Sequence, residues 1–117
     1  MRNFLIKSKI IGDVGILYPE GHLDAHSVEK FENEIMKMLD ESIVKVVINC
    51  TDLNYISSAG MGIIMGYLDE IREKGGDIKL SNVIDRVYEI FDLVGFTEIY
   101  KFVESEKKAI EQFDNVS

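Results

Sequence analysis

The sequence is poor in two residues that usually impose local structure: it has one cysteine, Cys50, and one proline, Pro19, in 117 residues. A single cysteine excludes a disulfide, a paired-cysteine metal site or a redox pair within the chain, and its place at the end of an apolar run predicts a buried thiol. The scarcity of proline, with a hydrophobic content of 46%, excludes an intrinsically disordered chain. We expect residues 1–117 to fold as one domain with one core.

Positive charge is also scarce: the chain has 13 lysines and arginines but 21 acidic residues, so its net charge is -8. The basic residues are scattered and form no stripe interleaved with aromatic residues, so nucleic acid is not an expected partner. The longest nearly uncharged run, Leu53–Leu68, is too short to span a bilayer, and Met1–Lys7 lacks the pattern of a signal peptide. We therefore expect a cytoplasmic protein with no membrane partner.

The first part of the chain predicts a hairpin followed by a helix. Residues 4–10 and 14–18 alternate between apolar and polar positions, which is typical of two paired strands, and the alternation stops before the proline. Between residues 24 and 39 the apolar residues recur at helical spacing and predict an amphipathic helix. Either Asp24 or Ser27 would cap its first turn.

The rest of the chain predicts alternating strands and helices. Residues 43–48 are mostly β-branched and apolar, which indicates an interior strand covered on both faces. Polar residues then predict a loop over 49–57, before a helix at 60–74 that ends at two glycines. Farther along we expect a brief strand at 78–80, a helix over 83–94, a short strand at 99–103 and a terminal helix over 105–113.

This order of elements favours an α/β fold. The strand at 43–48, the helix after it and the strand at 78–80 would form a right-handed parallel crossover, and the hairpin makes the sheet mixed. We expect a mixed four- to five-stranded sheet with about four helices packed against it.

Ser58 lies where the loop after the buried strand turns into the second predicted helix. The first N–H groups of a helix have no partner within it and carry partial positive charge, so an anion is stabilised there. A phosphoryl group on Ser58 would add about 1.5 to 2 negative charges and leave the domain folded, which makes a surface switch. The position also suits a plain helix cap by Ser57 or Ser58, and residue chemistry alone favours that interpretation.

Enzymatic alternatives are weaker. Ser58 has Gly60 two places after it but Ile56 two places before it, so the pair of glycines of a nucleophile elbow is incomplete, and a hydrolase would need His22 or His26 as its base. The glycines that follow Ser58 do not have the spacing of a dinucleotide-binding loop. His22, Asp24 and His26 are evenly spaced, but no further ligand signature accompanies them, so we expect no metal, no cofactor and no catalytic residue.

The helix after Ser58 carries more apolar residues than one face can bury. Met61 and Met65 are the members that would suit a docking surface beside Ser58, because methionine adapts to differently shaped partners. A helix buried on most sides would explain the same pattern.

The run Tyr55–Gly62 resembles the phosphorylation loop of the anti-sigma factor antagonists, the bacterial STAS domain family. That pattern is an apolar residue, Asp, Ser, a small residue, Gly, an apolar residue and Gly, and Ser58 takes the place of the phosphorylated serine. Three further segments are similar to the family in the same order: Gly21, Leu23 and Asp24; Gly75, Gly76, Ile78, Leu80 and Asn82; Val87, Phe91, Leu93, Gly95, Phe96 and Ile99.

The resemblance implies a cytoplasmic regulator that is not an enzyme. In its unphosphorylated form such a protein binds an anti-sigma factor that is also a serine kinase, and thereby frees a sigma factor for RNA polymerase. The kinase uses ATP to phosphorylate the serine, which ends the binding, and a phosphatase of the PP2C type restores it. Any nucleotide contact would come through the kinase.

The partner-binding surface that the resemblance implies surrounds the serine. Its expected members are Asp24, Ser57, Ser58, Ala59, Gly60, Met61, Gly62 and Met65. Two positions depart from the family pattern, because Ser57 stands where the family usually has Asp and Asn49 replaces a frequent Asp at the end of the central strand. The first departure motivates an alternative function, a non-switching STAS scaffold or sensor that binds a nucleotide, a lipid or a protein partner.

Overall fold

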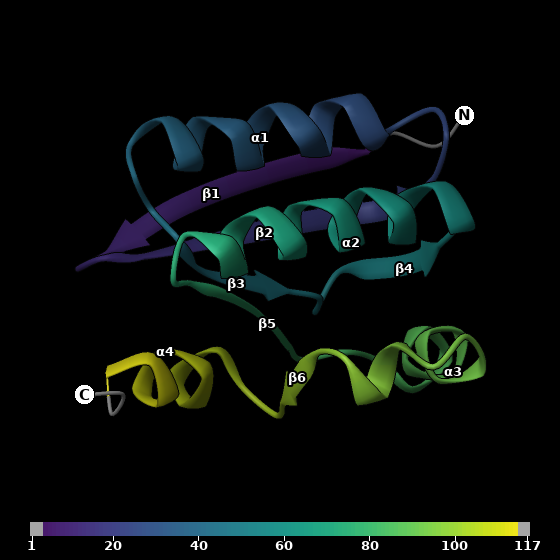
Figure 1. Ribbon diagram of the computed structural model, residues 1–117. Helices are drawn as coiled ribbons and strands as arrows, with labels where there is room; N and C mark the ends of the chain where they lie inside the picture. The colour runs from purple at the N-terminus through teal and green to yellow at the C-terminus, as the bar shows by residue number, and fades with distance from the viewer. Residues whose placement is uncertain (1–3, 115–117) are drawn as a thin grey trace.

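Strand β2, Val14–Leu23, organises a mixed sheet of six strands in the computed structural model, which describes residues 4–114. The sheet has the order β1-β2-β3-β5-β6, and β4 pairs with the far part of β2 (Figure 1). The other elements are β1 Leu5–Ile11, α1 Val28–Asp40, β3 Lys45–Asn49, β4 Leu53–Ile56, α2 Ser58–Glu73, β5 Asp77–Ser81, α3 Asp85–Leu93, the 3-10 helix η1 Phe96–Glu98, β6 Lys101–Val103 and α4 Glu106–Asp114.

The α/β class and the mixed sheet predicted from the sequence are confirmed. The predicted hairpin is β1 paired antiparallel with β2, and β2, β3, β5 and β6 pair in parallel. The sheet has one strand more than the expected four or five because residues 53–56, predicted as loop, form β4. Four residues with only Leu53 and Ile56 buried are too few to show a strand period in the sequence.

The prediction that the second strand ends before Pro19 is wrong. Strand β2 continues through Pro19 to Leu23, because Pro19 faces Ile6 of β1 and lies between the residues that pair with β3 and those that pair with β4. A proline removes one backbone donor, and here no parallel neighbour is placed opposite it to need that donor. The strand is thereby long enough to reach both neighbours.

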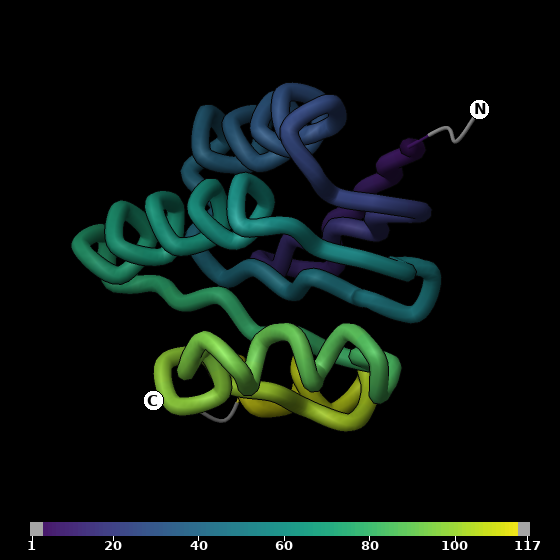
Figure 2. The backbone as a smooth tube through the Cα atoms, turned by 90° about the vertical axis from the view of Figure 1, so that its right-hand side faces the viewer, coloured from purple at the N-terminus to yellow at the C-terminus, as the bar shows by residue number. Residues whose placement is uncertain are grey.

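Both faces of the sheet are covered, as the composition of residues 43–48 predicts. On one face, α1, α2 and α3 contribute to the larger core, which includes Phe31, Leu68 and Phe91, each with 0% of its surface exposed. On the other face, α4 packs Ala109 and Phe113 over a smaller core. Figure 2 shows α1 and α2 side by side, away from the yellow C-terminal helix. Strand β3 is central and contributes to both cores.

Cys50 is buried, as predicted, and lies in the loop between β3 and β4. Burial raises the pKa of its thiol to about 12, so the thiol stays protonated at neutral pH. None of the helices described between residues 4 and 114 has the length and apolar character to span a bilayer.

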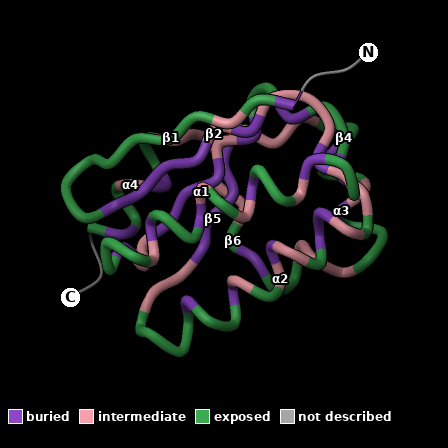
Figure 3. Tube along the Cα trace, turned by 90° about the horizontal axis from the view of Figure 1, so that it is seen from above, coloured by how far each residue is buried: buried purple, intermediate pink, exposed green. Residues whose placement is uncertain are grey.

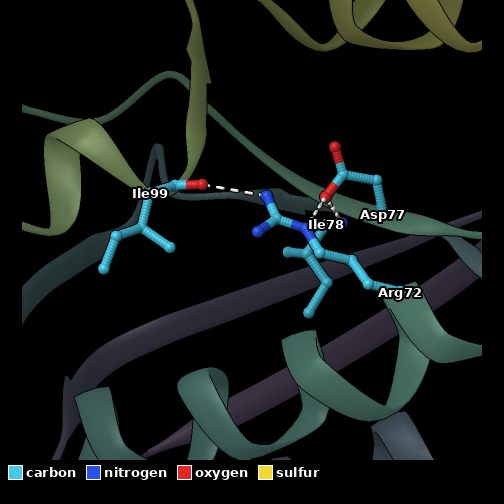
Figure 4. Close-up of polar contacts among 4 residues, drawn as sticks. All are labelled: Arg72, Asp77, Ile78 and Ile99. Atoms are coloured by element: carbon cyan, nitrogen blue, oxygen red, sulfur yellow. Dashed lines mark hydrogen bonds and ion pairs between the residues drawn. The ribbon is translucent and has the colours of Figure 1, made fainter.

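Polar contacts from Tyr67, in the middle of α2, and from Arg72, in its last turn, connect this helix to its neighbours. The hydroxyl of Tyr67 donates to Glu32 of α1 at 2.9 Å, and burial together with that bond raises the pKa of Tyr67 to about 12. In the last turn, Arg72 donates to Asp77 at 3.1 Å and to the backbone carbonyl of Ile99 at 2.9 Å (Figure 4). The start of β5 and the segment after η1 are thereby joined to the last turn of α2.

The amide of Asn49 connects the central strand to α4. Its Nδ2 donates to Glu106 at 3.0 Å, while its Oδ1 accepts from the N–H and the hydroxyl of Thr51. Glu106 also lies 3.7 Å from the ammonium of Lys9. Because an aspartate could not donate to Glu106, the structure supplies a physical reason for Asn49 where the family often has Asp.

We predict that Asn49→Asp destabilises the fold by about 1 to 3 kcal/mol at pH 7, because two carboxylates would then face each other across a partly buried contact. Urea denaturation followed by circular dichroism measures the change. The matched control is Asn49→Asp combined with Glu106→Gln, which restores a donor to the pair and should recover part of the loss. Equal stability of Asn49→Asp and the wild type would contradict the assigned role.

Candidate functional site

The parallel pairing of β2 with β4 brings two segments together that are far apart in the sequence. Leu23, the last residue of β2, faces Ile56, the last residue of β4. The N–H of Ser57 donates to the carbonyl of Leu23 at 2.9 Å. The residue after Leu23 is Asp24, so the first turn of α2 and the segment that carries Asp24 lie at the same end of the sheet.

Gly21 allows β2 to change neighbours. Its φ of 104° is accessible mainly to glycine, and the register with β4 shifts between Gly21 and His22. The N–H of Gly21 donates to the carbonyl of Asp52 at 2.9 Å, which anchors the turn before β4. Gly21, one of the residues that resemble the family, is therefore needed here for its backbone conformation.

Ser57 is the N-cap residue of α2, and Ser58 is the first residue of the helix. The hydroxyl of Ser57 accepts from the N–H of Gly60 at 3.4 Å. The side chain of Ser58 is exposed. The two interpretations that the sequence left open therefore apply to different residues: Ser57 caps the helix, and the Ser58 hydroxyl is free to face a partner.

The N-terminus of α2 differs in charge from those of the other helices. Among the α-helices described in residues 4–114, α1, α3 and α4 each have an acidic residue in the first turn, whereas α2 has none. An acidic residue in the first turn would offset the partial positive charge of the helix N-terminus. Without one, this charge is available to a phosphoryl group on Ser58.

Asp24 holds the turn before α1. Its Oδ1 accepts from the N–H of His26 at 2.9 Å, and its own N–H donates to the hydroxyl of Ser27. That hydroxyl donates to the carbonyl of His22 at 2.7 Å. Ser27 is therefore the N-cap residue by position, yet its side chain bonds the preceding turn and not the helix. The carboxylate of Asp24 is committed to this turn through one oxygen.

Two members of the predicted partner-binding surface are buried. Met61 is 8% exposed and belongs to the larger core, so of the two alternatives that the sequence left open, burial applies to Met61. Gly60 is buried as well, and a Cβ there would lie only 2.8 Å from the carbonyl oxygen of Leu23, so the position requires glycine. Both residues turn toward the sheet because residues 60, 61, 64 and 68 form the buried side of α2. They can affect the partner-binding surface only by fixing the position of α2 against the sheet, and not by direct contact with a partner.

Apart from Asp24 in the turn before α1, the other members lie at the N-cap or on the outward side of α2. Ser58 and Gly62 are exposed, and Ser57, Ala59 and Met65 are half-buried. A Cβ at Gly62 or at Gly66, one turn farther along, would meet no atom within 4 Å. These two glycines are therefore not required by packing, although glycine in a helix interior is destabilising relative to alanine.

The two histidines have different surroundings. The ring of His22 lies against that of Tyr55, with 5.4 Å between ring centroids, and His26 is exposed in the turn before α1. Within the part of the chain that the structure describes, no three His, Cys, Asp or Glu side chains are grouped so that they could hold a metal ion. The contact between His22 and Tyr55 depends on β4, which the sequence did not predict.

Comparisons with known proteins agree on one family. The family model described as the STAS domain matches residues 6–109. The chain is 28% identical over 94 residues to BtrV of Bordetella bronchiseptica, covering 80% of this chain and 81% of that protein. It is 26% identical over 102 residues to the anti-sigma F factor antagonist of Paenibacillus polymyxa, covering 83% and 84%.

A solved structure has the same fold. Unphosphorylated SpoIIAA, an anti-sigma factor antagonist, superposes with a TM-score of 0.80 at 21% identity, covering 98% of this chain and 99% of that one. Phosphorylated SpoIIAA, from Bacillus, superposes with a TM-score of 0.70 at 20% identity, covering 95% and 99%. At this level of identity the likeness concerns the fold.

We predict that Ser57→Ala lowers the free energy of unfolding by about 1 kcal/mol, because the N–H of Gly60 loses its capping acceptor. Ser58→Ala is the matched control and should change stability by less than about 0.5 kcal/mol, since its hydroxyl is exposed. Ser57→Asp should keep the cap. Urea denaturation of the three variants decides the assignment, and a larger loss in Ser58→Ala than in Ser57→Ala would overturn it.

Proposed function

Because the STAS domain model matches nearly the whole of it, this chain belongs to the STAS domain family, and we propose that it acts as an anti-sigma factor antagonist controlled by phosphorylation of Ser58. The observation that carries the proposal is the exposed Ser58 hydroxyl at the first position of α2, a helix without an acidic residue in its first turn. The names of the relatives support the same function.

In the proposed cycle the unphosphorylated protein binds an anti-sigma factor that is also a serine kinase, and this binding frees a sigma factor. The outward side of α2, with Ser58, Ala59, Gly62 and Met65, forms the contact surface. Ser57 and Asp24 keep that surface in shape through the cap and the turn described above. Gly60 and Met61 support it from the core.

Phosphorylation would end the binding by an electrostatic effect. The new group carries about 1.5 to 2 negative charges at neutral pH, and it must lose its hydration if the partner is to remain against α2. The helix N-terminus stabilises the phosphoryl group within the domain, so the fold persists while the surface changes. The domain is in this scheme the substrate of the kinase, not a catalyst.

The remaining partners follow from the cycle. ATP is bound by the kinase, so a nucleotide meets this chain only at the shared surface. A phosphatase of the PP2C type would remove the phosphoryl group and restore binding. These partners act in the cytoplasm, which is where the proposed function places the protein.

The presence of Ser57 in place of the family's usual Asp does not oppose the proposal on structural grounds. Serine and aspartate are both strong N-cap residues, and Ser57 fills that role here. The exchange removes one negative charge next to Ser58, so a phosphoryl group on Ser58 meets less repulsion from its neighbour than it would beside an aspartate.

We predict that one phosphoryl group is added to the protein by its cognate kinase with Mg²⁺ and ATP, and that Ser58→Ala prevents the addition. The kinases to use are the anti-sigma factor serine kinases encoded by the source organism, each purified, and the readout is intact mass. Ser57→Ala is the matched control and should still be modified. Modification of Ser58→Ala, or none of the wild type by any of these kinases, would contradict the proposal.

The same kinases test whether a negative charge at Ser58 weakens binding. The affinity of the Ser58→Asp variant for its kinase should be about tenfold or more lower than that of the wild type, because a charge is added at a surface that must be desolvated. Isothermal titration calorimetry measures the affinity. Unchanged affinity would remove the electrostatic argument while leaving the phosphorylation site open to the mass measurement.

We further predict that Gly62→Ala raises the free energy of unfolding by about 0.5 to 1 kcal/mol and yet lowers affinity for the kinase. An added methyl group meets nothing within the protein, so any loss of binding arises from contact with the partner. Gly66→Ala, one turn farther from Ser58, is the matched control, with the same gain in stability and a smaller loss of affinity. Unchanged affinity in both variants would exclude this side of α2 as the contact surface.

A further inference from the structure

Strand β1 forms one edge of the sheet, and its outer side is open. Among the strands described, β1 pairs only with β2. The pairing is regular over all seven residues from Leu5 to Ile11, with no bulge, and the strand contains neither proline nor glycine. Figure 3 shows this strand as largely exposed. Its backbone N–H and C=O groups on the outer side are therefore available to a further strand.

The opposite edge shows what a protected edge looks like in this fold. Strand β6 has three residues, Lys101–Val103, and a strand that short offers few backbone groups to pair with. On β1, by contrast, three apolar residues are substantially exposed: Leu5 is 52% exposed, Ile10 48% and Ile11 41%. The usual devices that blunt an edge are thus missing from β1, with the exception of its two lysines.

The two faces of β1 differ in chemistry. Ser8 donates to Glu34 of α1, and Lys9 lies near Glu106 of α4, so even and odd positions face opposite sides of the sheet. Lys7 shares the side of Lys9. On the side of α1 lies a hollow of about 280 Å³, lined by Ser8, Ile10 and Met38 and also by Lys9, Glu34, Lys37 and Glu41. A strand added at this edge would place one set of side chains near the lysines and the other near this hollow.

The charges decide which strand could be added. Strand β1 carries two lysines and no acidic residue, although the whole chain has a net charge of -8. For a second copy of β1, the antiparallel register centred on Ser8 is disfavoured, since it sets Lys7 opposite Lys9, and like charges opposite each other are destabilising. Glutamate or aspartate at alternate positions would instead be attracted to both lysines, of which Lys9 also lies 3.7 Å from Glu106.

We infer that the outer edge of β1 binds an extended acidic segment of a partner protein, which adds a strand to the sheet. The segment carries acidic residues at alternate positions facing Lys7 and Lys9 and small apolar residues at the positions between them. This surface is separate from Ser58, so the inference does not depend on the proposed phosphorylation.

The test uses a fluorescently labelled peptide, Thr-Glu-Val-Glu-Val-Glu-Thr, with blocked ends, and the wild-type protein at low ionic strength. Fluorescence polarisation should detect binding of this peptide and not of Thr-Lys-Val-Lys-Val-Lys-Thr. Lys7→Glu should weaken binding by about fivefold, as one attractive cross-strand pair becomes repulsive. Lys107→Glu, at an exposed position on α4, changes the net charge equally and should leave binding unaltered.

Strand addition is separated from simple charge attraction by methylating the peptide backbone. Two versions are made, one N-methylated at the odd residues and one at the even residues, because only one side of an added strand donates hydrogen bonds to β1. One version should lose binding. Equal affinity of both versions with the parent peptide overturns the inference, as does absence of binding or equal effects of Lys7→Glu and Lys107→Glu. A dimer of the protein that protects the β1 amides from exchange would assign the edge to a second copy and also overturn it.

Discussion

The site depends on one strand that has two parallel neighbours in succession. Strand β2 pairs with β3 over Val14–Leu17 and with β4 over Gly21–Leu23, and the change of neighbour occurs around Pro19 and the positive φ of Gly21. Without the second pairing, the end of β4 would have no fixed position relative to Asp24. The hydrogen bond from Ser57 to Leu23 and the close approach of Gly60 to the same carbonyl both follow from this arrangement.

In that geometry the two adjacent serines have different roles. Ser57 uses its hydroxyl within the fold, and Ser58 presents its hydroxyl outward. The cap keeps the helix start intact if Ser58 is modified, since the modified residue is not the one that satisfies a backbone donor. A change of charge at Ser58 can therefore alter binding while the core beneath, formed in part by Met61 and Ile64, remains packed.

The two faces of the sheet have different roles. The face covered by α1, α2 and α3 buries most of the apolar surface and orients the helix that carries Ser58. The other face is covered by α4 alone among the described helices that contribute to its core, and polar contacts of Glu106 with Asn49 and Lys9 supplement a small apolar contact there. Strand β1 borders both faces and leaves one backbone edge open.

Much of the fold was predictable from the sequence alone, because local patterns report local structure. The helical spacing of apolar residues located α1, α2 and α3, the β-branched run located β3, and Gly75 and Gly76 marked the end of α2. The hydroxyl of Ser58 at a helix start was likewise readable from residue order. Strand β4, the extension of β2 through Pro19, the burial of Met61 and the assignment of the cap to Ser57 were decided by tertiary structure. The two strand features and the burial of Met61 depend on neighbours distant in the sequence, and such contacts exist only once the sheet has brought the residues together. The cap is a local contact between Ser57 and Gly60, but residue order fits a cap by either serine, and the structure shows that the helix begins at Ser58.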